Sequence, residues 1–180
     1  MSFSSLILRA SKTILPLLIG AYFLLAGVDN MVDPSANWSY LVHVLSMDTV
    51  PADSPLRWRA VRSSAAGRFL FGGLIAWELG TALCCFVGGA RLLRTWFGSR
   101  LAFARAKGWA VAGLTCGLSG WLGFFLIGAG EWFQLWRGTF APALDVAARM
   151  FAVTALCLLY LTQEEDSPEA TDESPRKSAG

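Results

Sequence analysis

Charge is scarce in this chain of 180 residues: charged residues make up 16% of it and hydrophobic residues 54%. A typical soluble domain carries about 25% charged residues, so this composition excludes an ordinary soluble domain. The apolar residues gather in four stretches, at residues 6–28, 69–90, 109–129 and 146–161. Because a helix needs about 20 mostly apolar residues to cross hydrocarbon, we predict an all-α polytopic membrane protein with a bundle of four transmembrane helices.

Residues that bind metals or cofactors are also few. His43 is the only histidine, and we expect Asp48 to cap it. The four cysteines fall inside predicted spans, where they act as small hydrophobic residues: Cys84, Cys85, Cys116 and Cys157. A haem or zinc site needs more ligands than these, and the sequence has no phosphate loop, dinucleotide fingerprint, nucleophile elbow or metalloprotease motif. We therefore expect no metal, no cofactor and no catalytic residue, and an enzyme is the least favoured reading.

Basic residues are concentrated between the second and third apolar stretches: Arg91, Arg94, Arg100, Arg105 and Lys107. Such a run can bind nucleic acid, but membrane helices flank this one on both sides, so we expect no nucleic-acid partner. Short loops rich in Lys and Arg stay in the cytoplasm. With four spans, both termini are then predicted to be cytoplasmic, and Arg9 and Lys12 agree. The first stretch lacks Ala-x-Ala spacing, so we expect a retained span and not a cleaved signal peptide.

The segments outside the spans differ in character. In the first external loop, residues 30–67, apolar residues recur at the spacing of one helix face: Trp38, Leu41, Val42 and Leu45. We predict a short amphipathic helix over Trp38–Met47 and a second short helix over 56–62. The transmembrane domain is predicted to cover residues 1–162. Residues 163–180 are rich in Ser, Pro, Glu and Asp, which predicts a disordered, acidic cytoplasmic tail.

Small residues recur at four-residue spacing in the two central spans: Gly72, Ala76 and Gly80 in the second, and Gly113 and Gly117 in the third. Small residues at this spacing let membrane helices approach closely. We predict that the second and third spans contact each other through these two faces. A dimer interface is the alternative, and it is less favoured because partners within the chain are available.

Glu78 lies near the middle of the second predicted span. A charged group at that depth costs several kcal/mol, so it faces the bundle interior and needs a partner. Depth along the helices, at about 1.5 Å per residue, brings Arg149 within reach of Glu78, and Asp29 and Glu131 compete for Arg149. These four residues and His43 are the candidate functional polar cluster. Glu78 can instead be a structural carboxylate, and the cluster can equally be separately solvated groups.

Several blocks of sequence, in this order, resemble the bacterial "predicted small integral membrane protein" family, a domain of unknown function: His43–Thr49, Trp58–Ala60, Ile75–Leu79 and Gly130–Phe133. The resemblance covers about residues 12–162. It implies a four-helix, multi-pass protein of the inner membrane, and it implies no activity.

The sequence supports two functional hypotheses. The first is a non-catalytic accessory or scaffold component of a membrane complex, embedded in the lipid bilayer with a protein partner or further copies of itself. This hypothesis rests on the four well-formed spans, on the elaborate external loop, and on the lack of a recognisable set of catalytic residues in the sequence. The alternative is a small transport or ligand-binding membrane protein that uses Glu78 with Arg149.

Overall fold

The computed structural model describes residues 3–163, and within that range it contains helices and no strand. Six α-helices are joined by two short 3₁₀ helices and one π-helix: α1 (Phe3–Val32), α2 (Ser35–Ser46), η1 (Arg57–Arg59), α3 (Ser64–Arg94), α4 (Arg100–Ala106), α5 (Gly108–Gly120), η2 (Trp121–Trp132), η3 (Leu135–Arg137) and α6 (Pro142–Thr162). The predicted tail lies outside the described residues, apart from Gln163.

Four helical runs are long and apolar enough to cross a membrane: α1, α3, residues 100–132, and α6. This confirms the prediction of an all-α bundle with four spans. Each predicted apolar stretch lies inside one of these runs, and the helices extend beyond it because helical structure continues past the hydrocarbon into polar flanks. The amphipathic helix predicted between the first and second spans is α2, and the second short helix predicted there is a single 3₁₀ turn, η1.

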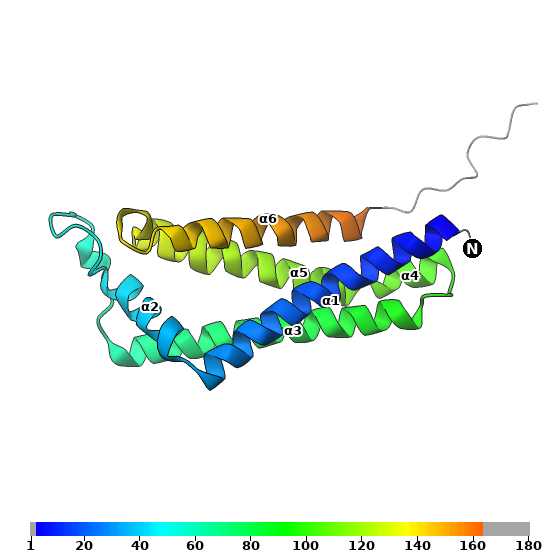
Figure 1. Cartoon of the computed structure of the whole chain (residues 1–180), viewed down its shortest axis with the longest axis horizontal. Coiled ribbons are helices and arrows are strands. Elements are labelled where there is room, and N and C mark those ends of the chain that lie inside the picture. The colour runs from blue at the N-terminus through cyan, green and yellow to red at the C-terminus, as the bar shows by residue number, and fades with distance from the viewer. Residues whose placement is uncertain (1–2, 164–180) are drawn as a thin grey trace, which may run out of the picture.

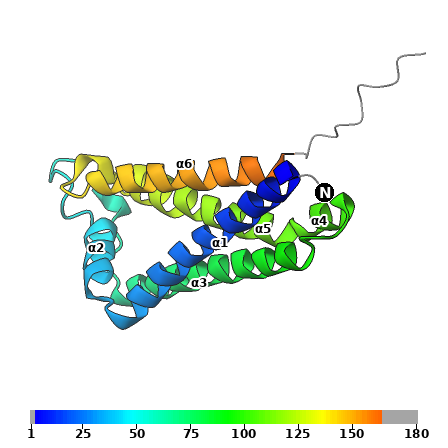
Figure 2. The same cartoon turned by 45° about the vertical axis from the view of Figure 1, so that its right-hand side comes forward.

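The long helices lie lengthwise in one bundle, with α1 along α3 and α6 along α5 and η2 (Figure 1). In Figure 2 the α1–α3 pair and α6 diverge toward the end where α2 lies across the bundle. The first described residues, the short helix α4 and the end of α6 meet at the opposite end (Figures 1 and 2). We call these two ends the α2 end and the α4 end.

The second and third spans do contact each other, but the prediction of which faces meet was half wrong. On α5, a Cβ at Gly113 would lie 2.8 Å from the backbone nitrogen of Cys85, and Gly88 of α3 lies directly against the backbone of Ala110. On α3, in contrast, a Cβ at Gly72 or Gly80 would meet nothing within 4 Å. The contact therefore uses the face of α3 that carries Cys85 and Gly88. Successive residues lie about 100° apart around a helix, so a four-residue spacing does not say which stripe faces the partner.

Aromatic rings fill the centre of the bundle. Phe23 is almost fully buried, with its ring centroid 5.1 Å from that of Trp77 and 6.0 Å from that of Trp121. The Trp77 indole lies over Gly120, where a side chain would collide with it. Its Nε1 donates a hydrogen bond to the carbonyl of Cys116 at 2.9 Å. The partly buried Trp77 indole thus keeps a partner for its polar atom, whereas Nε1 of the buried Trp121 has none in the described structure.

The third span changes its winding partway along. After Gly120 the α-helix continues as a π-helix over Trp121–Trp132, and the amide of Phe133 closes it by donating to the carbonyl of Gly128. Most π-helical segments are single-turn bulges, and they are frequent at functional sites. The sequence predicted only a regular helix over residues 109–129, because apolar composition does not distinguish the two windings.

Candidate functional site

Glu78 lies in a buried chain of hydrogen bonds near the middle of α3. Its side chain is 6% exposed, and its Oε2 accepts a hydrogen bond from Nδ2 of Asn30, 2.8 Å away. Asn30 is 2% exposed, and its Oδ1 accepts from Nδ2 of Asn37 at 2.6 Å. Asn37 itself is exposed. The three side chains therefore link the buried carboxyl group to the surface at the α2 end.

The local sequence explains this arrangement. A Cβ at Gly27 would lie 2.8 Å from Cδ2 of Leu79, so the missing side chain lets α1 approach α3 where Glu78 and Asn30 meet. Asp33 accepts hydrogen bonds from the backbone nitrogen (3.2 Å) and the hydroxyl (2.6 Å) of Ser35. These bonds hold the turn between α1 and α2, and they lower the pKa of Asp33 below its usual value. The turn brings the first residues of α2, including Asn37, back over the end of α1.

Arg149 does not partner Glu78, which corrects the pairing expected from depth along the helices. It is exposed on α6, and its Nε donates to the carbonyl of Asp145 in its own helix at 3.2 Å. Asp29 and Glu131 are exposed as well. Among residues 3–163, no hydrogen bond or ion pair joins any two of these predicted cluster members. The rise per residue predicts how deep each group lies along the bundle axis. It does not predict the direction of the side chain around its helix, and that direction decides which groups meet.

As predicted from the sequence, His43 lies beside Asp48. Its Nδ1 is 2.7 Å from Oδ2 of Asp48, so the histidine is capped by that carboxylate. The imidazole also packs on the ring of Phe140, with centroids 5.6 Å apart. His43 therefore fastens α2 to the segment that precedes α6. Within the described residues, no group of three or more His, Cys, Asp and Glu side chains is placed to hold a metal ion.

The segments at the α2 end form a folded cap over the bundle. Ser54 and Gln134 are both buried, and the Ser54 hydroxyl donates to Oε1 of Gln134 at 2.8 Å. Arg137 donates to the same Ser54 hydroxyl at 3.1 Å. The backbone amide of Val61 donates to the carbonyl of Leu45 at 2.7 Å. The loop between α1 and α3 and the segment after η2 are thus joined by specific polar contacts.

Two buried cations at the α4 end were missed as site residues. Arg9 is 1% exposed, and its Nη1 donates to the carbonyls of Trp96 (2.7 Å) and Gly98 (2.8 Å). Nζ of Lys12 donates to the carbonyl of Gln163 at 2.7 Å. Each cation thus binds carbonyls that follow a helix, α3 or α6, where the helix dipole is negative.

The sequence offered a signal for these two cations. Arg9 and Lys12 are three residues apart, so they share a helix face, and they interrupt the first apolar stretch. Their place on one face predicts a common polar environment at that end of the bundle, beyond the orientation of the chain. Asn30 and Asn37 gave a weaker signal, because an uncharged amide near the end of an apolar run is common and only the fold brings the two together.

The comparison with protein families agrees with this architecture. The family model described as "Predicted small integral membrane protein (DUF2165)" matches residues 8–164. The chain therefore belongs to this family and is an integral membrane protein with four candidate spans. No match to the chain was found among curated proteins or among solved structures.

Proposed function

We propose that this chain is a non-catalytic accessory component of a membrane complex, in which α3 packs against a transmembrane helix of a different protein. One observation carries the proposal: α3 has a face of small residues that its own bundle leaves open. Gly72, Gly73 and Ala76 are exposed, and a Cβ at Gly72, Gly73 or Gly80 would meet nothing within 4 Å.

The open face has the form of a helix-packing surface. Phe69 and Leu83 are exposed at either end of it, and they share the face because they lie three residues from Gly72 and Gly80, respectively. Lipid tails are as apolar as leucine, so helices associate in membranes through close packing, and small residues allow that closeness. The analogous stripe on α5 is fully used inside the bundle, at Gly113 and Gly117. The α3 face is thus available to a helix from outside the chain.

Substitution of the open face tests this role without disturbing the fold. Gly72→Leu with Gly80→Leu fills the face, and we expect the variant to keep its thermal stability in detergent but to lose its partner in affinity purification. The matched control is Gly123→Leu on η2, because Gly123 is also exposed and open. The control should retain the partner.

The purification also separates the other outcomes. Wild-type protein that always elutes from mild detergent without any other chain would contradict the accessory role. If the wild type elutes only with further copies of itself, and the double variant is a monomer, the α3 face forms a homo-oligomer and the proposal fails. If Gly123→Leu also loses the partner, the α3 face is not the specific binding surface for that partner.

The second candidate is a small transport or ligand-binding protein that uses Glu78. The observation that favours it is the polar chain from exposed Asn37 through Asn30 to the buried carboxyl group. Such a chain offers a polar group or a proton a route from the α2 end toward mid-membrane. Arg149, which was predicted to pair with Glu78, makes no hydrogen bond or ion pair with Asn37, Asn30 or Glu78 in the described structure.

Glu78→Gln distinguishes the two candidates. The glutamine keeps a side-chain oxygen that accepts from Asn30, so the variant should fold with unchanged thermal stability. If the variant then loses the cellular phenotype of the wild type, the carboxyl group has a functional role and the second candidate is favoured. If the variant is stable and fully complements a deletion strain, the result supports the accessory role, in which Glu78 is structural.

For localisation, we propose the bacterial inner membrane, with both termini and the α4 end in the cytoplasm. The basic segment of residues 91–107 supports this orientation through the positive-inside rule.

A further inference from the structure

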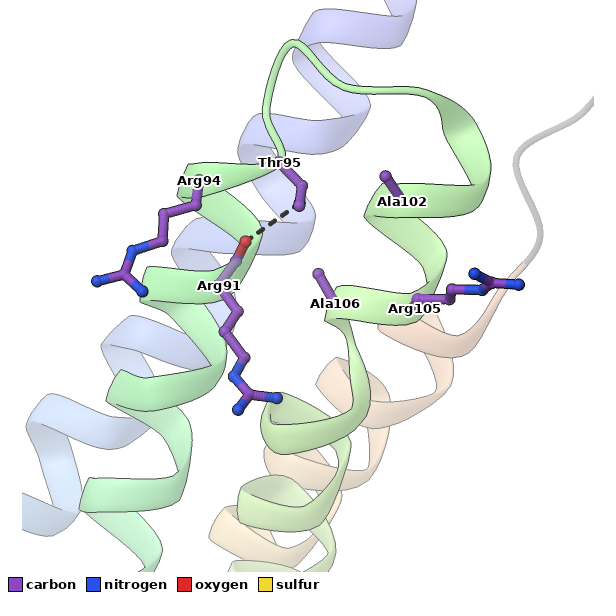
Figure 3. Close-up of a pocket in the computed structure, with 6 residues that line it drawn as sticks. All are labelled: Arg91, Arg94, Thr95, Ala102, Arg105 and Ala106. Atoms are coloured by element: carbon purple, nitrogen blue, oxygen red, sulfur yellow. Dashed lines mark hydrogen bonds between the residues drawn. The ribbon is translucent and has the colours of Figure 1, made fainter.

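A shallow hollow of about 300 Å³ lies at the α4 end, between the last turn of α3 and the helix α4 (Figure 3). Arg91, Arg94 and Thr95 line it from the α3 side, and Ala102, Arg105 and Ala106 line it from α4. The Thr95 hydroxyl donates to the carbonyl of Arg91 at 3.1 Å and closes the last turn of α3. In Figure 3 Arg91 extends between the two helices, whereas Arg94 and Arg105 point outward on opposite sides of the hollow.

The three guanidinium groups have no counter-charge in the described chain. Among residues 3–163, the side chains of Arg94 and Arg105 make no hydrogen bond and no ion pair. The guanidinium group of Arg91 makes none either and lies 5.6 Å from the ring centroid of Trp109. Residues 79–130 contain neither Asp nor Glu. Arg9 at the same end differs, because backbone carbonyls already bind its guanidinium group. The hollow is therefore flanked by positive charge that no acidic side chain among residues 3–163 neutralises.

Apolar side chains lie next to these arginines. A second hollow of about 350 Å³ is lined by Leu93, Trp96 and Phe97. Leu93 is 50% exposed, Phe97 is 84% exposed, and Leu101 on α4 is exposed too. Exposed apolar and cationic groups thus alternate around the end of α3, which matches an amphiphile better than a small hydrophilic ion.

We propose that the α4 end binds an anionic phospholipid, with its headgroup phosphate beside Arg91 in the hollow and its acyl region against Leu93 and Phe97. The exposed side chains of Arg94 and Arg105 turn inward to complete the contacts with the phosphate. Arginine binds phosphate oxygens through paired N–H donors. Basic pockets beside transmembrane helices are known to take anionic headgroups. A free phosphate would use the arginines alone. The acidic segment 164–180 would also use the arginines but not the apolar side chains.

Native mass spectrometry of the full chain, in detergent with equal amounts of phosphatidylglycerol and phosphatidylcholine, tests the proposal. We expect the wild type to retain phosphatidylglycerol preferentially. Arg91→Gln, Arg94→Gln and Arg105→Gln together should abolish the preference, with a loss of roughly fivefold for each arginine. The control is the triple variant Arg62→Gln, Arg68→Gln and Arg149→Gln, which also removes three positive charges. These arginines are exposed and lie outside the hollow, so the control should keep the preference.

Other outcomes overturn the proposal. Equal retention of both lipids by the wild type would show that the hollow does not select an anionic headgroup, and equal losses in the two triple variants would show a general effect of net charge. Displacement of the lipid by millimolar inorganic phosphate would identify a site for a free anion. If the preference exists only after the acidic residues of 164–180 are neutralised, that segment occupies the hollow in the full chain.

Discussion

At the scale of single residues, the buried carboxyl group of Glu78 is held by a neutral amide. Asn30 donates to it, and Asn37 donates in turn to Asn30, so the buried Glu78 and Asn30 side chains both have partners. Unpaired polar groups in a membrane interior cost several kcal/mol. The position of Glu78 was predictable from its place in an apolar run, but its partner was not, because Asn30 comes from a helix whose rotation the sequence does not reveal.

We predict that Glu78 is coupled to Asn30 and not to Arg149. Asn30→Leu leaves the carboxyl group buried without its donor, which should cost about 1–3 kcal/mol. Adding Glu78→Leu removes the stranded group, so the double variant should be more stable than the sum of the single losses. The measurement is a double-mutant cycle by thermal unfolding in detergent. The parallel cycle with Arg149→Gln should be additive within about 0.5 kcal/mol, and strong coupling there would contradict the structure.

A second residue-scale prediction concerns Tyr40 on α2. Its hydroxyl is buried and has no hydrogen-bond partner in the described structure. Tyr40→Phe removes this unsatisfied group, so stability at neutral pH should stay equal or rise by up to about 1 kcal/mol. The control is Tyr160→Phe, which should lose stability because the Tyr160 hydroxyl is bonded to Ser11 at 2.7 Å.

The same residue gives a pH dependence. Burial raises the pKa of Tyr40 to about 12 from an ordinary value near 10. Below pH 10 the phenol is protonated in both the folded and the unfolded states, so it contributes no dependence on pH. Between pH 10 and 12 the unfolded state releases this proton first, and the stability of the wild type should fall. A melting-temperature profile that falls by the same amount in Tyr40→Phe would refute this assignment.

At the scale of elements, α3 presents two small-residue faces with different uses. One face, with Cys85 and Gly88, packs against α5, and the other, with Gly72 and Gly80, is open. The existence of four spans and of α2 followed from apolar length and periodicity alone. Three other features could not be predicted from the sequence. They are which α3 face packs against α5, the π-helical winding of η2, and the caps made by Arg9 and Lys12. These features depend on contacts between helices that lie far apart in the sequence.

The two faces predict opposite responses to one added methyl group. Gly88→Ala places a Cβ against the backbone of Ala110, which cannot rotate away, so we expect a loss of about 1–3 kcal/mol from overpacking. Gly80→Ala meets nothing within 4 Å. It should leave stability unchanged or raise it by about 0.5–1 kcal/mol, because alanine favours the helix. Thermal unfolding of the purified variants decides, and equal losses at both positions would reject the described packing.

At the scale of the whole molecule, the two ends are built differently. The α2 end is a folded cap with buried Ser54 and Gln134, whereas the α4 end combines a short basic helix with two buried cations. We predict that reporter fusions at Gly98 behave as cytoplasmic and fusions at Asp53 as periplasmic. Periplasmic activity from Gly98 would reverse the proposed orientation, and activity on the same side from both positions would conflict with the bundle itself.

The contact between Lys12 and Gln163 has a consequence for biosynthesis. Lys12 lies on the first of the four candidate spans, whereas the carbonyl that binds it belongs to Gln163, the last described residue. Arg9 obtains its carbonyls earlier, when the loop after α3 has been made. If the spans insert in chain order, we expect the bundle to close in two steps. Between the two steps Lys12 lacks the carbonyl of Gln163, and we expect lipid headgroups or the insertion machinery to hold its charge.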